Sequence, residues 1–202
     1  MYSLKIQKGR YRGKSIHCPL PVRGISNSTP SMFKEAVFQI LEVRLGSEKK
    51  DWVFFDLCAG SGQMAYEALS QDYGEVHICE LDRDRFSNIL KEVKSYNFPI
   101  ILHRKDFIRM NTLISQKEKS VLYIDLPYTY WKDGKCDSIS KFLEALESAL
   151  QKISTEGKKS SGLICIQGRS EFIPDEHLKY VTKLMYRTYG NNSLTLLEFA
   201  VK

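Results

Sequence analysis

The sequence lacks several features that would assign it to common protein classes. It contains no apolar run long enough to cross a bilayer, and its first residues, Met1 to Lys5, lack the apolar core of a secretion signal. Its five cysteines are widely spaced and form no Cys-x-x-Cys pair, and its four histidines are scattered. We therefore expect buried thiols rather than disulfides, and a cytoplasmic protein with neither a metal nor a membrane partner.

Acidic residues are missing from the N-terminal sixth of the chain. Residues 1–34 contain seven lysines and arginines and no acid, whereas residues 35–202 contain 23 basic and 24 acidic side chains. The alternating residues on both sides of Gly9-Arg10-Tyr11-Arg12-Gly13 predict a β-hairpin with a basic tip. Such a hairpin either aids solubility or binds a phosphate backbone, and the arginines at its tip favour contact with nucleic acid.

A strand, a tight turn and a helix are predicted over residues 53–69. The apolar run Val53–Asp56 leads into Ala59-Gly60-Ser61-Gly62, after which apolar residues recur at helical spacing. The glycines permit backbone conformations closed to other residues and allow a ligand to approach the loop closely. Neither the third glycine of G-x-G-x-x-G nor the Gly-Lys-Ser/Thr of a P-loop follows, so a diphosphate is not the favoured ligand.

Three predicted strands run into acids, namely Asp56, Glu80 and Asp106. Because open α/β sheets bind ligands at the carboxyl ends of their parallel strands, these carboxylates should face one crevice. Glu80 lies 24 positions after Asp56. This is close to the spacing of a Rossmann unit, in which an acid about 20 residues beyond the glycine loop accepts hydrogen bonds from both hydroxyls of a ribose. Each acid alone could be a helix cap. Together they favour a nucleoside-bearing ligand without a phosphate chain, and S-adenosylmethionine is the common cofactor of that kind.

A fourth predicted strand, Ser120–Ile124, leads into Asp125-Leu126-Pro127-Tyr128. The exocyclic amine of a nucleobase is a poor nucleophile because its lone pair is delocalised into the ring. The Asp125 carboxylate and the Leu126 carbonyl, whose direction Pro127 restricts, can accept the hydrogens of such an amine. Tyr128 offers a ring on which a flipped base can stack. The four residues are therefore candidate catalytic residues, and the next two aromatic residues, Tyr130 and Trp131, are either loop anchors or further stacking groups.

Over nearly its whole length the chain resembles the RsmD-type 16S ribosomal RNA guanine-N2 methyltransferases, within the class I methyltransferases. The resemblance lies in the segments 9–14, 34–41, 56–62, 67–70, 80–82 and 125–128, and in Tyr189-Gly190 before Leu194-Thr195-Leu196. Two departures stand out. Leu126 replaces the usual first proline of the catalytic loop, and residues 27–35 lack two or three arginines of the corresponding family stretch.

The resemblance implies a Rossmann-like α/β fold, with a seven-stranded, mostly parallel sheet whose last strand is antiparallel. We expect a basic hairpin and linker over residues 1–26 and a methyltransferase domain over residues 27–202. The cofactor contacts implied are Asp56, Ala59, Gly60, Ser61, Gly62, Glu80, Leu81, Asp106 and Phe107, and the expected RNA contacts are Arg10, Arg12, Lys14 and Lys34.

The sequence therefore predicts a monomeric enzyme that uses S-adenosylmethionine to methylate guanine N2 of 16S ribosomal RNA on a flipped base. Its partner would be ribosomal RNA, either in the small subunit or in an assembling particle. Two alternatives stay open. The same catalytic loop serves methylation of adenine N6 in DNA, and a chain with Leu126 and fewer arginines could be an inactive RNA-binding protein that keeps the fold.

Overall fold

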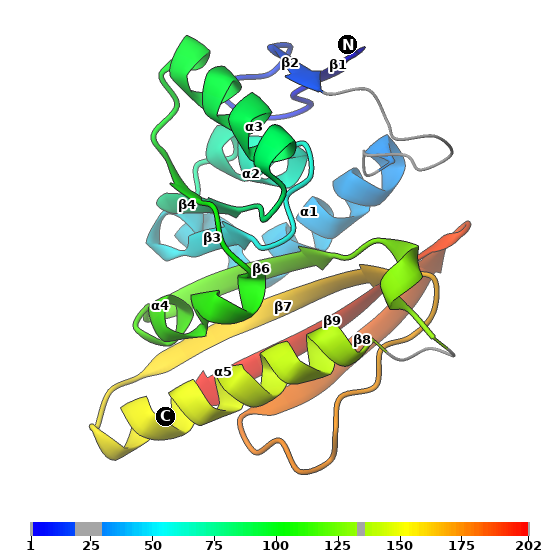
Figure 1. Cartoon of the computed structure of the whole chain (residues 1–202). Helices are drawn as coiled ribbons and strands as arrows, with labels where there is room; N and C mark the ends of the chain where they lie inside the picture. Colours follow the sequence, from blue (N-terminus) through cyan, green and yellow to red (C-terminus); the bar gives the residue numbers. More distant parts are fainter. Residues whose placement is uncertain (1, 19–29, 133–135, 202) are drawn as a thin grey trace. The chain divides into compact units, whose positions relative to one another are not determined.

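The computed structural model describes residues 2–18, 30–132 and 136–201 (Figure 1). Most of the predicted linker, and the first part of the arginine-poor stretch, lie outside these ranges. The chain divides into two compact units, residues 1–105 and residues 106–202.

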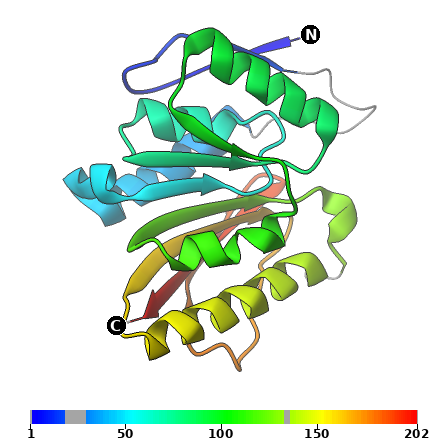
Figure 2. The same ribbon diagram turned by 60° about the vertical axis from the view of Figure 1, so that its left-hand side comes forward.

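A short hairpin opens the first unit, as the sequence predicts. Strand β1 (Tyr2–Lys5) pairs antiparallel with β2 (Ser15–Cys18), and Leu4 lies opposite Ile16. The hairpin lies beside helix α3 (Arg83–Tyr96) (Figure 2), where the Tyr96 hydroxyl donates a 2.6 Å hydrogen bond to the Ser15 carbonyl. The hairpin therefore packs on the body of its unit.

The rest of the first unit consists of three parallel strands and the helices that connect them. Helix α1 (Ser31–Leu45) and the 3-10 helix η1 (Gly46–Asp51) precede β3 (Val53–Asp56), and α2 (Gln63–Ser70), β4 (Glu75–Cys79), α3 and β5 (Ile100–His103) follow. Strands β3 and β5 both pair parallel with β4. Phe54 anchors the core, because its ring stacks on Phe38 at 5.9 Å and meets Tyr73 edge-on at 5.2 Å.

The second unit begins with two short helical turns and then alternates strands and helices. Its elements are η2 (Phe107–Met110), α4 (Asn111–Ser115), β6 (Lys119–Asp125), η3 (Tyr128–Tyr130), α5 (Asp137–Thr155), β7 (Ser160–Gly168), β8 (Val181–Tyr189) and β9 (Asn192–Val201). Strands β6 and β7 run parallel, whereas β9 pairs antiparallel with both β7 and β8. Helix α5 buries one apolar face, from Ile139 to Ile153.

The seven longer strands have the order β5-β4-β3-β6-β7-β9-β8. This is a mostly parallel sheet in which the last strand of the chain is antiparallel, so the predicted Rossmann-like α/β fold is confirmed. Among the residues that the structure describes, no helix has both the length and the apolar character needed to cross a membrane.

Candidate functional site

The glycine loop of the first unit lies between β3 and α2. Gly60 and Gly62 have φ values of +57° and +77°, which residues with a Cβ rarely adopt. The Gly62 N–H donates a 2.7 Å bond to the Ala59 carbonyl, and the Ala59 N–H donates a 3.2 Å bond to the Cys79 carbonyl at the end of β4. The loop is therefore a tight turn tied to the neighbouring strand, as the sequence predicts.

Asp56, the last residue of β3, supports the helix that follows the loop. Its side chain is 2% exposed, and its Oδ2 accepts a 3.2 Å hydrogen bond from the Ala65 N–H. This bond satisfies one of the backbone donors that a helix leaves unpaired in its first turn. The contact places Asp56 beneath the loop, where it orients α2.

Glu80, which follows β4, holds two loops at once. Its Oε2 accepts a 2.8 Å bond from the Gly60 N–H, and its Oε1 accepts a 2.9 Å bond from the Asp82 N–H. The side chain is buried, at 8% exposure. Each carboxylate oxygen can accept more than one hydrogen bond, so Glu80 keeps acceptor capacity for a ligand. Next to it Leu81 is 65% exposed and offers an apolar surface.

Five of the predicted cofactor residues, Ala59, Gly60, Ser61, Gly62 and Glu80, are thus brought together in the first unit, with Asp56 beneath them. Asp106 and Phe107 belong to the second unit. Asp106 caps η2, because its Oδ1 accepts a 3.0 Å bond from the Ile108 N–H, and the Phe107 ring lies 5.4 Å from that of Phe142. Their roles toward a cofactor stay predictions.

Asp125 is the last residue of β6 in the second unit. Burial raises the pKa of its carboxyl from 3.8 to about 7. Leu126 is buried at 6% exposure, so its side chain anchors the loop that follows β6 by packing. The Tyr130 N–H closes the following turn with a 2.9 Å bond to the Pro127 carbonyl. The side chain of Tyr128, the predicted stacking ring, lies outside the described residues.

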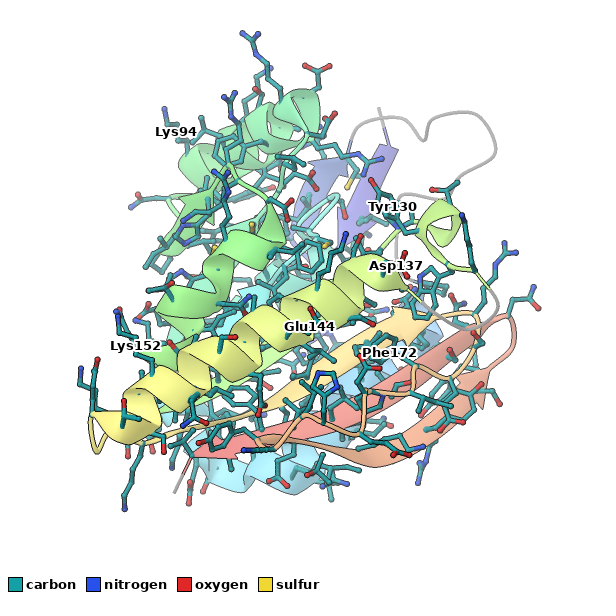
Figure 3. The ribbon with its side chains drawn as sticks, turned by 60° about the horizontal axis from the view of Figure 1, so that its bottom comes forward. Lys94, Tyr130, Asp137, Glu144, Lys152 and Phe172 are labelled. Carbon is teal, nitrogen blue, oxygen red and sulfur yellow. The ribbon has the colours of Figure 1, made fainter. Side chains whose placement is uncertain are left out.

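Trp131 is a loop anchor. A Cβ at Gly168, the last residue of β7, would lie 2.7 Å from the Trp131 ring, so only glycine leaves room for the indole. The ring also meets Phe172 edge-on at 6.4 Å. Tyr130, by contrast, is 54% exposed (Figure 3), which leaves its ring available for stacking. The structure thus separates two neighbouring aromatics that the sequence left equivalent.

A polar network beside Asp125 was missed by the sequence analysis. Gln167 of β7 lies opposite Asp125 in the strand register and is 3% exposed. Its Oε1 accepts a hydrogen bond from the Tyr123 hydroxyl, and its Nε2 donates a 3.3 Å bond to Asn192 Oδ1. The signal in the sequence was a lone glutamine that directly follows the apolar residues 163–166. Its hydrogen-bonded amide fixes the carboxyl ends of β6 and β7.

Three of the predicted RNA contacts, Arg10, Arg12 and Lys14, lie in the loop that connects β1 to β2, and their surroundings differ. Arg10 approaches Asp72 at 3.7 Å, and Lys14 lies 4.8 Å from the centre of the Tyr96 ring. Arg12 is exposed and lines a surface hollow of about 380 Å³ together with Gln7, Lys8, Gly9 and Glu35. Among the described residues Arg12 has no acidic partner, so its charge is the most available of the three for a phosphate.

The prediction that Lys34 contacts RNA is wrong. Its side chain is 1% exposed, and its Nζ lies 2.6 Å from Oε1 of Glu67, which is equally buried. Burial lowers the pKa of Lys34, and the hydrogen bond and charge of Glu67 oppose that shift. A cation enclosed with its counterion cannot bind a phosphate at the surface.

Within the described ranges, no group of three or more His, Cys, Asp or Glu side chains is arranged to hold a metal ion. The chemistry available in the two units consists of a buried acid beside a glycine loop, and of a second acid whose pKa lies near neutrality. The first suits the hydroxyl groups of a nucleoside, and the second suits proton transfer at pH 7.

Comparisons with known proteins agree with this description. The family model described as Conserved hypothetical protein 95 matches residues 4–198. The solved Escherichia coli protein yhhF is 14% identical with a TM-score of 0.72, and the alignment covers 100% of both chains. The Haemophilus influenzae protein HI0767 is 18% identical with a TM-score of 0.60, over 98% of this chain and 99% of that one. The two carry provisional names as a methyltransferase and a methylase.

A third solved structure is an RNA methyltransferase from Salinibacter ruber in complex with S-adenosyl-L-homocysteine. It is 14% identical with a TM-score of 0.50, over 86% of this chain and 93% of that one. At such identities these likenesses establish a shared fold and leave the chemistry to the site residues. A search of curated proteins finds no significant match.

Proposed function

Because the chain belongs to the Conserved hypothetical protein 95 family of RsmD-type methyltransferases, we propose that it methylates guanine N2 of small-subunit ribosomal RNA. The protein is a class I methyltransferase in family and in fold, and the proposal concerns its substrate. The observation that carries it is Asp125, an acid with a pKa near 7 at the end of a central strand, followed by a loop that leaves an aromatic exposed.

The Asp125 carboxylate suits the chemistry of an exocyclic amine. Together with the Leu126 carbonyl it can accept the two amine hydrogens and direct the nitrogen lone pair away from the ring. When the new N–CH₃ bond forms and the S–CH₃ bond breaks, the nitrogen gains a positive charge and releases one proton. A carboxylate with a pKa of about 7 accepts that proton more readily than an ordinary aspartate does.

The first unit has residues that fit the cofactor. S-adenosylmethionine supplies, when bound, a methyl group on a positively charged sulfur. The glycine loop leaves its backbone accessible at Gly60 and Gly62, Glu80 keeps acceptor capacity for a ribose diol, and the exposed Leu81 can cover an adenine ring. Asp106 and Phe107 of the second unit stay predicted cofactor contacts.

Labelled methyl transfer tests the proposal. Purified protein is incubated with tritiated S-adenosylmethionine and with either ribosomal RNA or duplex DNA. We expect label in the RNA alone, and N2-methylguanosine among its digested nucleosides. Label in DNA would instead support adenine N6 methylation, and retention of RNA without any label would support an inactive RNA-binding protein.

Replacing Glu80 with glutamine should weaken cofactor binding by about 10- to 100-fold, since hydrogen bonds to a charged group are worth about 1.5–3 kcal/mol. The amide keeps the size of the side chain but turns an NH₂ group toward either the Gly60 or the Asp82 N–H. Calorimetric titration with S-adenosylmethionine measures the effect. Asp84→Asn, an exposed change two residues after Asp82, is the matched control, and equal affinities for the two variants would contradict the assignment.

The methyl transfer rate should rise with pH through about 7 and level off above it. Only the ionised form of Asp125 can take up the released proton, and its pKa is raised to about 7 by burial. An aspartate at its ordinary pKa of 3.8 would give a flat profile over the same range. Single-turnover rates between about pH 5.5 and 8.5 decide between the two profiles.

A further inference from the structure

The loop that connects β1 to β2 is bound to helix α2 through hydrogen bonds from the backbone of the loop to side chains of the helix. The Gln7 N–H donates a 2.7 Å bond to Glu67 Oε1, and the Lys8 N–H donates a 3.4 Å bond to Glu67 Oε2. One turn later, the Ser70 hydroxyl accepts a 2.9 Å bond from the Tyr11 N–H and donates a 2.5 Å bond to the Lys8 carbonyl. Four polar groups of the loop are therefore paired with two side chains of one helix.

Gly9 brings the same loop into direct contact with the end of α2. Its φ is +79°, and a Cβ at this position would lie 1.7 Å from the Ser70 carbonyl oxygen. That carbonyl also accepts a 2.8 Å bond from the Arg10 N–H. No side chain fits at residue 9 unless the loop moves away from the helix.

Lys34 allows Glu67 to hold the loop between β1 and β2 while its carboxylate is buried. An ionised carboxylate that is 1% exposed is costly unless a cation and hydrogen bonds compensate it. Lys34 supplies the cation at 2.6 Å, and the Gln7 and Lys8 N–H groups supply the hydrogen bonds. We use the name clamp for the side chains of Lys34, Glu67 and Ser70 together with the backbone groups of Gln7, Lys8 and Tyr11 that they hold.

Helix α2 carries the glycine loop at one end and the clamp at the other. Its N-cap is Gly62, and Asp56 accepts a bond from its Ala65 N–H, whereas Glu67 and Ser70 occupy its second half. One short helix therefore fixes the basic loop relative to the cofactor loop.

We propose that Glu67, neutralised by Lys34, is a positioning residue that holds the basic loop Lys8–Lys14 in a fixed place, so that Arg12 contacts a phosphate of the substrate RNA. The inference rests on the proposed RNA substrate. The clamp removes most of the loop's freedom before RNA arrives, and a preorganised cation loses less entropy on binding a phosphate than a mobile one. The ligand class is the phosphodiester backbone of RNA.

Two variants open the clamp by independent routes, and each has a matched control. Glu67→Gln removes the charge that Lys34 and the backbone share, and its control is Glu42→Gln, which removes the glutamate of the more exposed Lys49 pair at 3.4 Å in the same unit. Gly9→Ala displaces the loop while leaving the ion pair intact. Its control is Gly13→Ala in the same loop, where φ is +84° but nothing lies within 4 Å of the added Cβ.

Hydrogen exchange and RNA binding give the readouts. In both clamp variants, exchange of the Gln7 to Tyr11 amides should accelerate at least about tenfold. Affinity for a ribosomal RNA fragment should fall about tenfold, and the slope of log affinity against log salt should shrink by about 0.7, the value for one phosphate contact. Affinity for S-adenosylmethionine should stay within about twofold of wild type, because the Glu80 contacts are untouched.

Several outcomes would overturn the positioning role. Unchanged exchange would show that Glu67 and Gly9 do not hold the loop. Faster exchange with an unchanged salt slope would show that the loop makes no positioned phosphate contact, and a parallel loss of cofactor affinity would reduce the clamp to general stability. Wild-type protein that binds no RNA would refute the proposed function itself, whereas RNA binding that all variants share would refute only this inference.

Discussion

Replacement of Asp125 with alanine is expected to lower the methyl transfer rate by about 10³-fold, within the range that a positioned base contributes. The variant loses both the acceptor for an amine hydrogen and the group that takes the released proton. It should fold normally, because burial disfavours the ionised form of this carboxyl. The raised pKa means that ionisation of this carboxyl opposes folding progressively as the pH rises from about 3.8 and fully above about pH 7, and alanine removes that penalty.

Single-turnover measurement with tritiated S-adenosylmethionine isolates this effect from product release. Asp125→Asn is the informative companion, since it keeps a carbonyl acceptor but cannot take a proton. We expect it to retain more activity than alanine and to lose the rise in rate near pH 7. Asp137→Asn, at the exposed start of α5, is the control. If the alanine variant transfers methyl groups at the wild-type rate, Asp125 is not part of the reaction.

Replacement of Lys34 with methionine should lower the free energy of unfolding by about 3–5 kcal/mol, the usual cost of removing one partner of a buried pair. Methionine keeps most of the side-chain volume, but the Glu67 carboxyl, at 1% exposure, loses its counterion and keeps the Gln7 and Lys8 backbone donors. The loss is large because neither partner of the pair is screened by solvent.

Urea unfolding at pH 7 measures this change. Lys49→Met is the control, since Lys49 pairs with the half-exposed Glu42 and such pairs contribute about 0–1 kcal/mol. The double variant Lys34→Met with Glu67→Gln should recover part of the loss, because no charge is then buried. An unfolding midpoint for Lys34→Met equal to that of the control would refute the assignment of Lys34 as the buried counterion.

The sequence could place the elements of the candidate site because each is encoded locally. The glycine loop follows its strand directly, and Asp82, the residue before α3, caps this helix with bonds of 3.0 Å and 2.9 Å from the Asp84 and Arg85 N–H groups. Glu80 likewise directly follows β4, and Asp125 is the last residue of β6. Such assignments depend on residues within about one helical turn of each other, which is the range that sequence patterns report.

Contacts between residues that are far apart in the sequence could not be predicted from such local patterns. Lys34 shares a helix face with Val37, Phe38 and Leu41, which hinted at burial, but its counterion lies 33 residues later. The Trp131 ring packs against Gly168, where the absence of a side chain leaves room for it. The neighbouring Tyr130 is exposed.

The sequence by itself determined the strands of an open α/β sheet, the glycine loop, the acids at the strand ends and the basic hairpin, because hydrophobic period, turn chemistry and charge are local properties of the chain. The seven-stranded Rossmann-like arrangement was implied by the family resemblance. Tertiary structure alone decided which charges are available. A lysine and an arginine have the same formal charge in the sequence, yet Lys34 is enclosed with Glu67 while Arg12 faces solvent. The reason is physical: the free energy of a charge depends on the water and counterions around it, and only the fold assigns those surroundings.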